Sequence, residues 1–435
     1  MYVDVRRRTA ALVSVLSIAV VMGARPVRAV AQEASEDAGH AHMHGGDDGS
    51  PPATREGSGT SWLPDESPMY AIHRPAGEWM VMLHTNVFLQ YLRESGDRGS
   101  DATGSINWFM AMADRKAGTG RVMLRTMVSA EPATIDECGY PNELATGERC
   151  DAGPLHDRQH PHDLLMELAA RYDRPIAGGV RLQLYGGPAG EPALGPVAFM
   201  HRTSALPNPI APVTHHWFDS THVTFGVATL GVYGGKWKAE GSLFNGREPD
   251  DNRTDVDFGA MDSYSGRFWF LPTSQWSLQV SAGHLHEAES EGVGALRLDV
   301  DRVTASATYH RTTLERTWWA TTVGWGRNAE PLQQPTQALF GETSLTFSDR
   351  DAFYGRAEWS QKTDDDLITS AAGIHDVVKL QGGYTRYLGE WKSLVPGIGA
   401  GLSTGIVPAS LVPEYGRRAN LGISVYVTLR PKAQE

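Results

Sequence analysis

Beyond residue 31 the sequence has no long hydrophobic run, and no stretch approaches the ~18 apolar residues of a membrane-spanning helix. Basic residues are also too few to balance the acidic ones. The chain has 39 Lys and Arg against 51 Asp and Glu, a formal net charge of −12. This acidic excess argues against nucleic acid as a partner and suits cations or a solvated exterior.

The first 31 residues differ from the rest of the chain. Three arginines at 6–8 precede an apolar stretch, Thr9 to Ala24, that is too short to span a bilayer comfortably. Ala29-Val30-Ala31 then forms a small-x-small cleavage site. These features predict a secretory signal peptide over residues 1–31, with an uncleaved anchor as the alternative. We expect the mature chain to begin at Gln32 and to cross the inner membrane completely.

Cysteine is rare, since Cys138 and Cys150 in ECGYPNELATGERC are the only two in the chain. In an oxidising compartment the two thiols are expected to pair and to close a small loop. Two free thiols are the alternative.

Composition divides the mature chain near residue 68. Residues 32–68 are rich in Gly, Ser, Pro, Asp and Glu and have almost nothing to bury, which predicts a disordered tail. Residues 69–435 form the second part, and strands dominate it. Segments such as WMVMLHTNVFLQYL (79–92), RVMLRTMVS (121–129) and LGISVYVTL (421–429) alternate between two faces with period two, as strands do.

The connections between these strands alternate between short turns and long loops. Eight long and seven short connections predict 16 antiparallel strands. Loss of the weakest pair, 179–187 with 195–201, would leave 14. The two longest connections are 131–178 and 202–220. Short turns at one end and long loops at the other are typical of a transmembrane β-barrel, whereas a secreted soluble β-protein would need other elements to cover its second strand faces.

In its signal peptide, alternation and turn asymmetry, the chain resembles Gram-negative outer-membrane β-barrel proteins. The resemblance implies an all-β, closed antiparallel barrel in outer-membrane lipid, with the N-terminal tail in the periplasm. In one respect the chain departs from these proteins, which often end on an aromatic residue, because it ends VYVTLRPKAQE. The sequence leaves the oligomeric state open.

One segment of the predicted barrel looks helical. In HDRQHPHDLLMELAARYDRP (156–175), Asp163 is placed to cap a short helix over Asp163–Tyr172. Leu164, Leu165 and Leu168 lie on its apolar face, which needs a surface to pack on. The nearest such surface is the barrel lumen.

Ten of the 16 histidines fall at the long-loop end of the predicted barrel. Neutral imidazole is a good ligand for Zn or Cu. We therefore predict that segment 156–163 and loop 201–222 fold inward and approach one another. Polar pore-lining roles are the alternative, because no HExxH or comparable spacing occurs. The candidate metal ligands are His156, His160, His162, Asp163, His201, His215 and His216.

The tail adds a second group of candidate ligands in GHAHMHGGDDG, namely His40, His42, Met43 and His44. Over these few residues it is similar to the His/Met-rich N-terminal segment of copper-resistance outer-membrane proteins of the CopB type. That resemblance implies copper handling, although the repeated Met-rich motifs of those proteins are missing here. A merely solvated tail is the alternative.

Methionines form a third feature of the predicted barrel. By alternation, six of them on the first three strands point into the lumen beside His84. Thioether is a soft ligand suited to Cu(I), and methionine is also a flexible packing residue. The six are Met80, Met82, Met110, Met112, Met123 and Met127.

Together these features favour an outer-membrane barrel that handles or passes a transition metal, copper above all, with Cu or Zn as the only expected cofactor. A general small-molecule or cation channel is the alternative, because 16 strands can enclose a water-filled bore. A barrel hydrolase would need Ser204, Ser220 or Thr221 beside the loop histidines. No GxSxG nucleophile elbow occurs, so we expect no enzyme.

Overall fold

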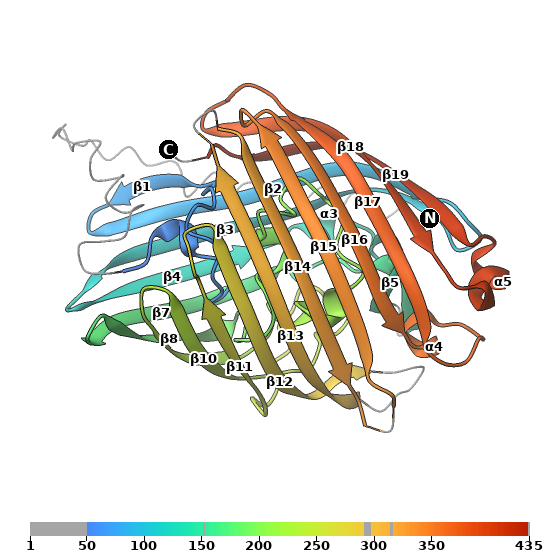
Figure 1. Ribbon diagram of the computed structural model, residues 1–435, viewed down its shortest axis with the longest axis horizontal. Coiled ribbons are helices and arrows are strands. Elements are labelled where there is room, and N and C mark those ends of the chain that lie inside the picture. The colour runs from blue at the N-terminus through green and yellow to red at the C-terminus, as the bar shows by residue number, and fades with distance from the viewer. Residues whose placement is uncertain (1–49, 151–152, 291–296, 314–315, 332, 434–435) are drawn as a thin grey trace.

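The computed structural model describes residues 50–150, 153–290, 297–313, 316–331 and 333–433. Within them, 16 antiparallel strands form one closed barrel, as predicted, and β19 pairs with β2 to complete the ring (Figure 1). The barrel strands are β2 Trp79–Glu94, β3 Asp101–Ala117, β4 Gly120–Val128, β7 Leu165–Ala177, β8 Val180–Ala189, β9 Val227–Tyr233, β10 Trp237–Phe244, β11 Ser263–Phe270, β12 Trp276–Ser290, β13 Arg297–Thr312, β14 Trp318–Ala329, β15 Thr336–Phe347, β16 Asp351–Lys362, β17 His375–Tyr387, β18 Leu394–Ile406 and β19 Ala419–Pro431.

Several shorter elements accompany the barrel strands. β1 (Ile72–Ala76) pairs with the start of β2 on the edge that β19 uses further along. No helix in the described ranges is both long and apolar enough to cross a membrane. The remaining elements are η1 Ala53–Arg55, α3 Glu131–Thr134, β5 Tyr140–Cys150, β6 Gly153–Gln159, η2 Phe199–His201, η3 His215–Trp217, η4 Ser220–His222, α4 Asp364–Leu367, η5 Ala409–Leu411 and α5 Val412–Tyr415.

The two faces of the barrel wall have opposite chemistry. Along β19, Leu421, Ile423 and Val425 point outward, and Leu421 is 66% exposed. Ser424 and Thr428 point inward and are buried. Apolar residues outside and polar residues inside form the pattern of a barrel that stands in lipid, because no water is available there to solvate outward polar groups.

The predicted helix Asp163–Tyr172 is wrong, because Leu165–Ala177 forms strand β7, hydrogen-bonded to β4 and β8. A register shift at Met127/Val128 inserts one extra residue, which breaks the period-two pattern at Leu165 and Met166. From Glu167 onward, charged groups face the lumen, where Tyr185 donates to Glu167 over 2.8 Å. The hydrogen bonds of β7 to β4 and β8, together with the ion pairs inside the lumen, outweigh the helix propensity of Leu, Met, Glu and Ala.

This strand also corrects the boundaries of the long loops. They span 129–164 and 190–226 in place of 131–178 and 202–220. The predicted strand at 195–201 does not form. Its Gly195 N–H instead donates to Ser281 Oγ inside the barrel, over 2.8 Å. Because β7 replaces that strand in the count, the total of 16 is unchanged and both loops still leave the same end.

The disulfide is present as predicted. Cys138 and Cys150 are bonded, with their Cα atoms 5.3 Å apart. The bond spans the β5 arm of the β5–β6 hairpin, which folds into the lumen and buries Leu144 completely. Lys379 of the wall donates to Glu143 O of this hairpin over 2.9 Å.

The predicted tail is wrong for residues 50–68, which form an ordered plug at the short-turn end of the barrel. Arg55 donates to Gly235 O in one short turn, and Glu66 N–H donates to Ser274 O in another. Trp62 and Leu63 are buried against wall residues. The composition of this segment predicts disorder because the apolar partners of Trp62 and Leu63 lie in the barrel wall and in loop 190–226. The signal peptide and the rest of the tail lie outside the described residues.

Candidate functional site

A cavity of about 630 Å³ lies in the lumen between the plug and the inner faces of β2, β3 and β4. Thioethers and imidazoles line part of its surface, together with five arginines and three carboxylates, among them Arg121 and Asp114. Its soft and nitrogen donors are Met69, Met80, Met82, Met110, Met112, Met123 and Met200, with His73, His84 and His201.

Strand register brings the methionines together. Met82 is the cross-strand partner of Met112, and Met110 is the partner of both His84 and Met127. Residues directly opposite one another in neighbouring strands present their side chains on the same face. The predicted inward orientation is therefore confirmed for the methionines of strands β2, β3 and β4 that are buried in this cluster.

Sequence reasoning missed two methionines that line the cavity, Met69 and Met200. Met200 packs against the methionine cluster from loop 190–226. Met166, also missed, is fully buried in that cluster but does not line the cavity. Met166 was missed because the register shift in β7 turns its side chain inward, within a segment for which the sequence predicted a helix. Met200 carries no period signal, since it lies in a short 3-10 turn.

The predicted approach of the two histidine segments is present in the structure. The rings of His160 and His215 have centroids 6.4 Å apart, and those of His162 and His222 are 5.3 Å apart. His216 lies against His215 at 4.4 Å. Below them His201 packs on Trp108 at 4.6 Å and borders the methionine cavity. The buried imidazoles thus link the long-loop end to the cavity.

Two of the predicted ligands stand apart from this group. His156 pairs with Asp157 at 2.8 Å and its side chain is 38% exposed. Asp163 lies 3.7 Å from Arg253, an ion pair that engages its carboxylate. Within the described ranges, the lumenal imidazoles also form no trio whose ligand atoms all lie within 4.8 Å of one another. They line a path and do not form a closed metal site.

Burial keeps most of these imidazoles neutral. It lowers the pKa of His160, His201 and His215 well below the ordinary value, with further lowering from neighbouring positive charges. The pKa of His222 falls to about 3 for the same reasons. A neutral ring offers a lone pair to a metal.

His162 is the exception among the buried imidazoles. Burial alone would lower its pKa, but the charge of Glu131 and the hydrogen bond to it at 2.8 Å outweigh that effect and raise the pKa. Glu131 also accepts from the backbone N–H of Asn107 and of His162, and sequence reasoning missed it. The charged pair fixes the end of loop 129–164 against the barrel wall.

Several buried ring nitrogens lack a hydrogen-bond partner among the described residues. They are both nitrogens of His215 and the Nε2 atoms of His84, His201 and His222. A buried polar atom without a partner is costly, by roughly 1–3 kcal/mol. A metal ion or water molecules can satisfy these atoms, and the combined donor set of imidazole and thioether fits copper.

No family model matches the sequence, and no curated protein matches it either. Solved structures do resemble the fold. The high-pH structure of Pseudomonas putida OprB aligns with a TM-score of 0.50 and 8% identity, over 81% of this chain and 94% of that one. The fold is that of the outer-membrane porins.

Two other porins align at similar length. The anion-selective porin from Comamonas acidovorans has a TM-score of 0.49 and 10% identity, over 81% of this chain and 100% of that one. Salmonella typhi OmpF, in complex with daunomycin, has a TM-score of 0.48 and 10% identity, over 82% and 100%.

Acidification is expected to destabilise the barrel through the neutral histidines. Because the pKa of His215 is lowered, the unfolded chain takes up a proton below about pH 6.5 that the folded chain does not. The stability is present above that pH and is lost as the pH falls, by about 2 kcal/mol at pH 5 for one such group. The pKa of His162 is raised, so its contribution to folding stability is present at low pH and is lost as the pH rises.

Urea unfolding of the detergent-solubilised protein at pH 7.5, 6 and 5 measures this loss. In His215→Asn the loss between pH 7.5 and 5 should be smaller than in the wild type by about 2 kcal/mol, since that group no longer titrates. Parallel curves for the two proteins would show that His215 is not held neutral.

Proposed function

We propose that this protein is an outer-membrane barrel that binds copper in its lumen and passes it between the long-loop end and the short-turn end. The observation that carries the proposal is the methionine- and histidine-lined cavity of about 630 Å³. Thioether sulfur favours Cu(I), and imidazole accepts either oxidation state of copper.

The spacing of the donors supports a route. His160, His215 and His216 form a group at the long-loop end. The neutral His222 lies beside the charged His162, which offers no lone pair to a metal. A void of about 10 Å³ touches His201, His222 and Met127 as well as the plug, and the larger cavity begins at His201. An ion can move along such a route when each position binds weakly enough to release it to the next.

The tail fits the same proposal. In the orientation we propose, the short-turn end, where residue 50 lines the cavity, faces the periplasm. His40, His42, Met43 and His44 stay predicted copper ligands and lie outside the described residues.

A general small-solute or cation channel is the second candidate. The porin fold favours it, whereas the plug and the two inward loops occupy much of the bore.

The hydrolase alternative has Ser204 as one candidate nucleophile, and this residue hydrogen-bonds to Glu342 at 2.8 Å. That the protein is not an enzyme stays a prediction.

Competition titration with a Cu(I)-specific chromophore tests the copper proposal. Replacement of Met110, Met112 and Met123 by leucine keeps the side-chain volume and removes three thioethers from the cavity. We expect Cu(I) affinity to fall at least tenfold.

Met166→Leu is the matched control, because Met166 belongs to the same buried cluster but does not line the cavity. It should bind Cu(I) as the wild type does. Equal Cu(I) affinity in the triple variant and the wild type would refute the proposal and leave the channel as the better interpretation.

A further inference from the structure

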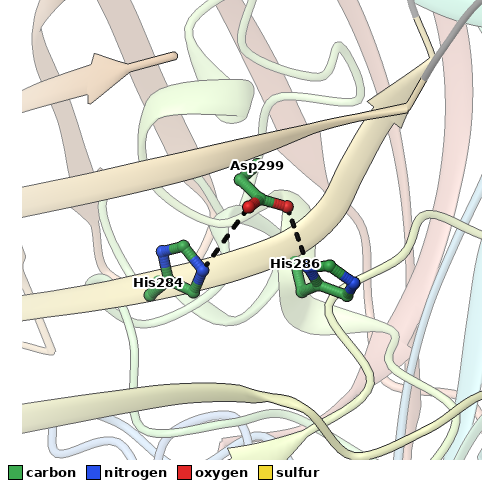
Figure 2. A group of neighbouring side chains, drawn as sticks. All are labelled: His284, His286 and Asp299. Atoms are coloured by element: carbon green, nitrogen blue, oxygen red, sulfur yellow. Dashed lines mark ion pairs between the residues drawn. The ribbon is translucent and has the colours of Figure 1, made fainter. Parts of the chain in front are cut away.

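The geometry points to a second metal site, outside the lumen, where His284, His286 and Asp299 would hold a divalent transition-metal ion at the outer rim of the barrel. Nothing in this inference depends on copper passing through the lumen. The donors come from the neighbouring strands β12 and β13, and Figure 2 shows both histidines turned toward the same carboxylate.

The alternation of β12 places the two histidines on the outer face. Leu285, between them, points into the lumen and is 1% exposed. His284 stacks on the outward Tyr264, with ring centroids 5.4 Å apart. The side chains of His284, His286 and Asp299 are 29%, 39% and 37% exposed, so an ion in solution can reach them.

The distances within the trio suit metal binding. The ligand atoms all lie within 4.8 Å of one another. His286 Nδ1 is 2.9 Å from Asp299 Oδ1, and His284 Nε2 is 3.8 Å from Asp299 Oδ2. The second separation is too long for a hydrogen bond. Two ligands of one tetrahedral ion lie roughly 3.3 Å apart, given bonds of about 2.0–2.1 Å, so small side-chain movements complete the site.

A β-bulge produces this arrangement. The pairing of β12 with β13 shifts between Leu285 and Glu289, and Glu287 has a positive φ of 49°. Bulges at barrel rims redirect side chains. Here the Glu287 N–H donates to Asp299 Oδ1 over 2.9 Å, which fixes the carboxylate between the two rings.

Carboxylates also face the ring nitrogens that point away from the proposed metal. His284 Nδ1 lies 2.8 Å from Asp301 Oδ1, and His286 Nε2 lies 3.9 Å from Asp262 Oδ2. Arg247 holds Asp262 through two hydrogen bonds of 2.9 Å. A carboxylate on the far nitrogen orients a metal-binding imidazole and raises its basicity. A simple ion pair needs only one carboxylate for each imidazole, whereas both His284 and His286 have a carboxylate near each ring nitrogen.

The donor set determines the class of ion. Two imidazoles and one carboxylate suit Zn²⁺, Co²⁺, Ni²⁺ or Cu²⁺, whereas thioether-rich surroundings suit Cu(I). The rim site and the lumenal cavity therefore differ in the metal chemistry that they select.

Titration of the detergent-solubilised mature protein with Co²⁺, followed by its visible absorption bands and by displacement with Zn²⁺, tests the inference. We expect one Co²⁺ per chain at this site. His284→Asn combined with His286→Asn should abolish its bands and weaken Zn²⁺ binding at least tenfold. Asp299→Asn should weaken binding in the same direction without removing an imidazole.

Asp255→Asn is the matched control, because Asp255 belongs to an exposed carboxylate group with Asp250 and Asp257 in the neighbouring loop. It should leave the Co²⁺ spectrum unchanged. Unchanged Co²⁺ and Zn²⁺ binding in the double histidine variant would overturn the inference. Cu(I) affinity of that variant should equal that of the wild type, so failure at the rim and failure of the lumenal proposal are distinguishable.

Discussion

Deletion of residues 50–68 is expected to turn a barrel of low conductance into an open one. In planar bilayers the single-channel current should rise at least tenfold over that of the wild type. The plug fills the short-turn end, and the cavity above it is bounded by residues 50–57 on that side. Without the plug, the cavity would open directly to solution.

The plug is held by the wall and not by its own core. Arg125 donates to Gly59 O, and Lys238 donates to Thr60 O. Arg267 donates to Thr60 Oγ1 over 3.0 Å. Gly59 has a positive φ of 51°, and a Cβ there would lie 2.7 Å from Glu191 Cβ, so this close approach requires glycine. Buried cations of the wall thus have their partners in the plug.

Deletion of residues 32–49 alone is the matched control, since it shortens the same tail and leaves the plug in place. Its conductance should match that of the wild type. If deletion of 50–68 left the current unchanged, the inward loops alone would close the bore and the plug would serve only to line the cavity.

Arg202→Met is expected to lower the free energy of unfolding by about 3–5 kcal/mol, because it breaks a buried network and leaves a carboxylate without its cation. Arg202 is 1% exposed and anchors loop 190–226 in the lumen. Its Nε donates to Glu342 over 2.6 Å, and its Nη1 donates to Asp219 over 3.0 Å. Glu342 keeps Arg356 as a second partner, whereas Asp219 loses its ion pair.

Urea unfolding and limited proteolysis of the loop together measure the effect of Arg202→Met. Arg115→Met is the control, because Arg115 is half exposed and faces the exposed Glu78 at 3.2 Å. Such a surface pair contributes about 0–1 kcal/mol. Equal losses in the two variants would mean that Arg202 does not anchor the loop.

The sequence alone determined the barrel, the number of its strands and the inward face of the methionines. A strand in a barrel wall faces lipid on one side and polar surroundings on the other. Its alternation with period two can therefore be recognised from neighbouring residues such as Leu421, Ile423 and Val425. Loop parity placed His160 and His215 at the same end. Because Cys138 and Cys150 are the only two cysteines, an oxidising compartment predicted their bond.

Only the tertiary structure decided which segment forms the fourth strand, where residues 50–68 lie and what surrounds each histidine. β7 is built of helix-forming residues, and the ladder and lumenal partners that override their propensity come from distant parts of the chain. Backbone and hydroxyl oxygens of the plug accept hydrogen bonds from cations of three wall strands, and no local sequence pattern predicts these contacts. His284 and Asp299 face one another through a bulge, because register across strands is fixed by pairing and not by spacing.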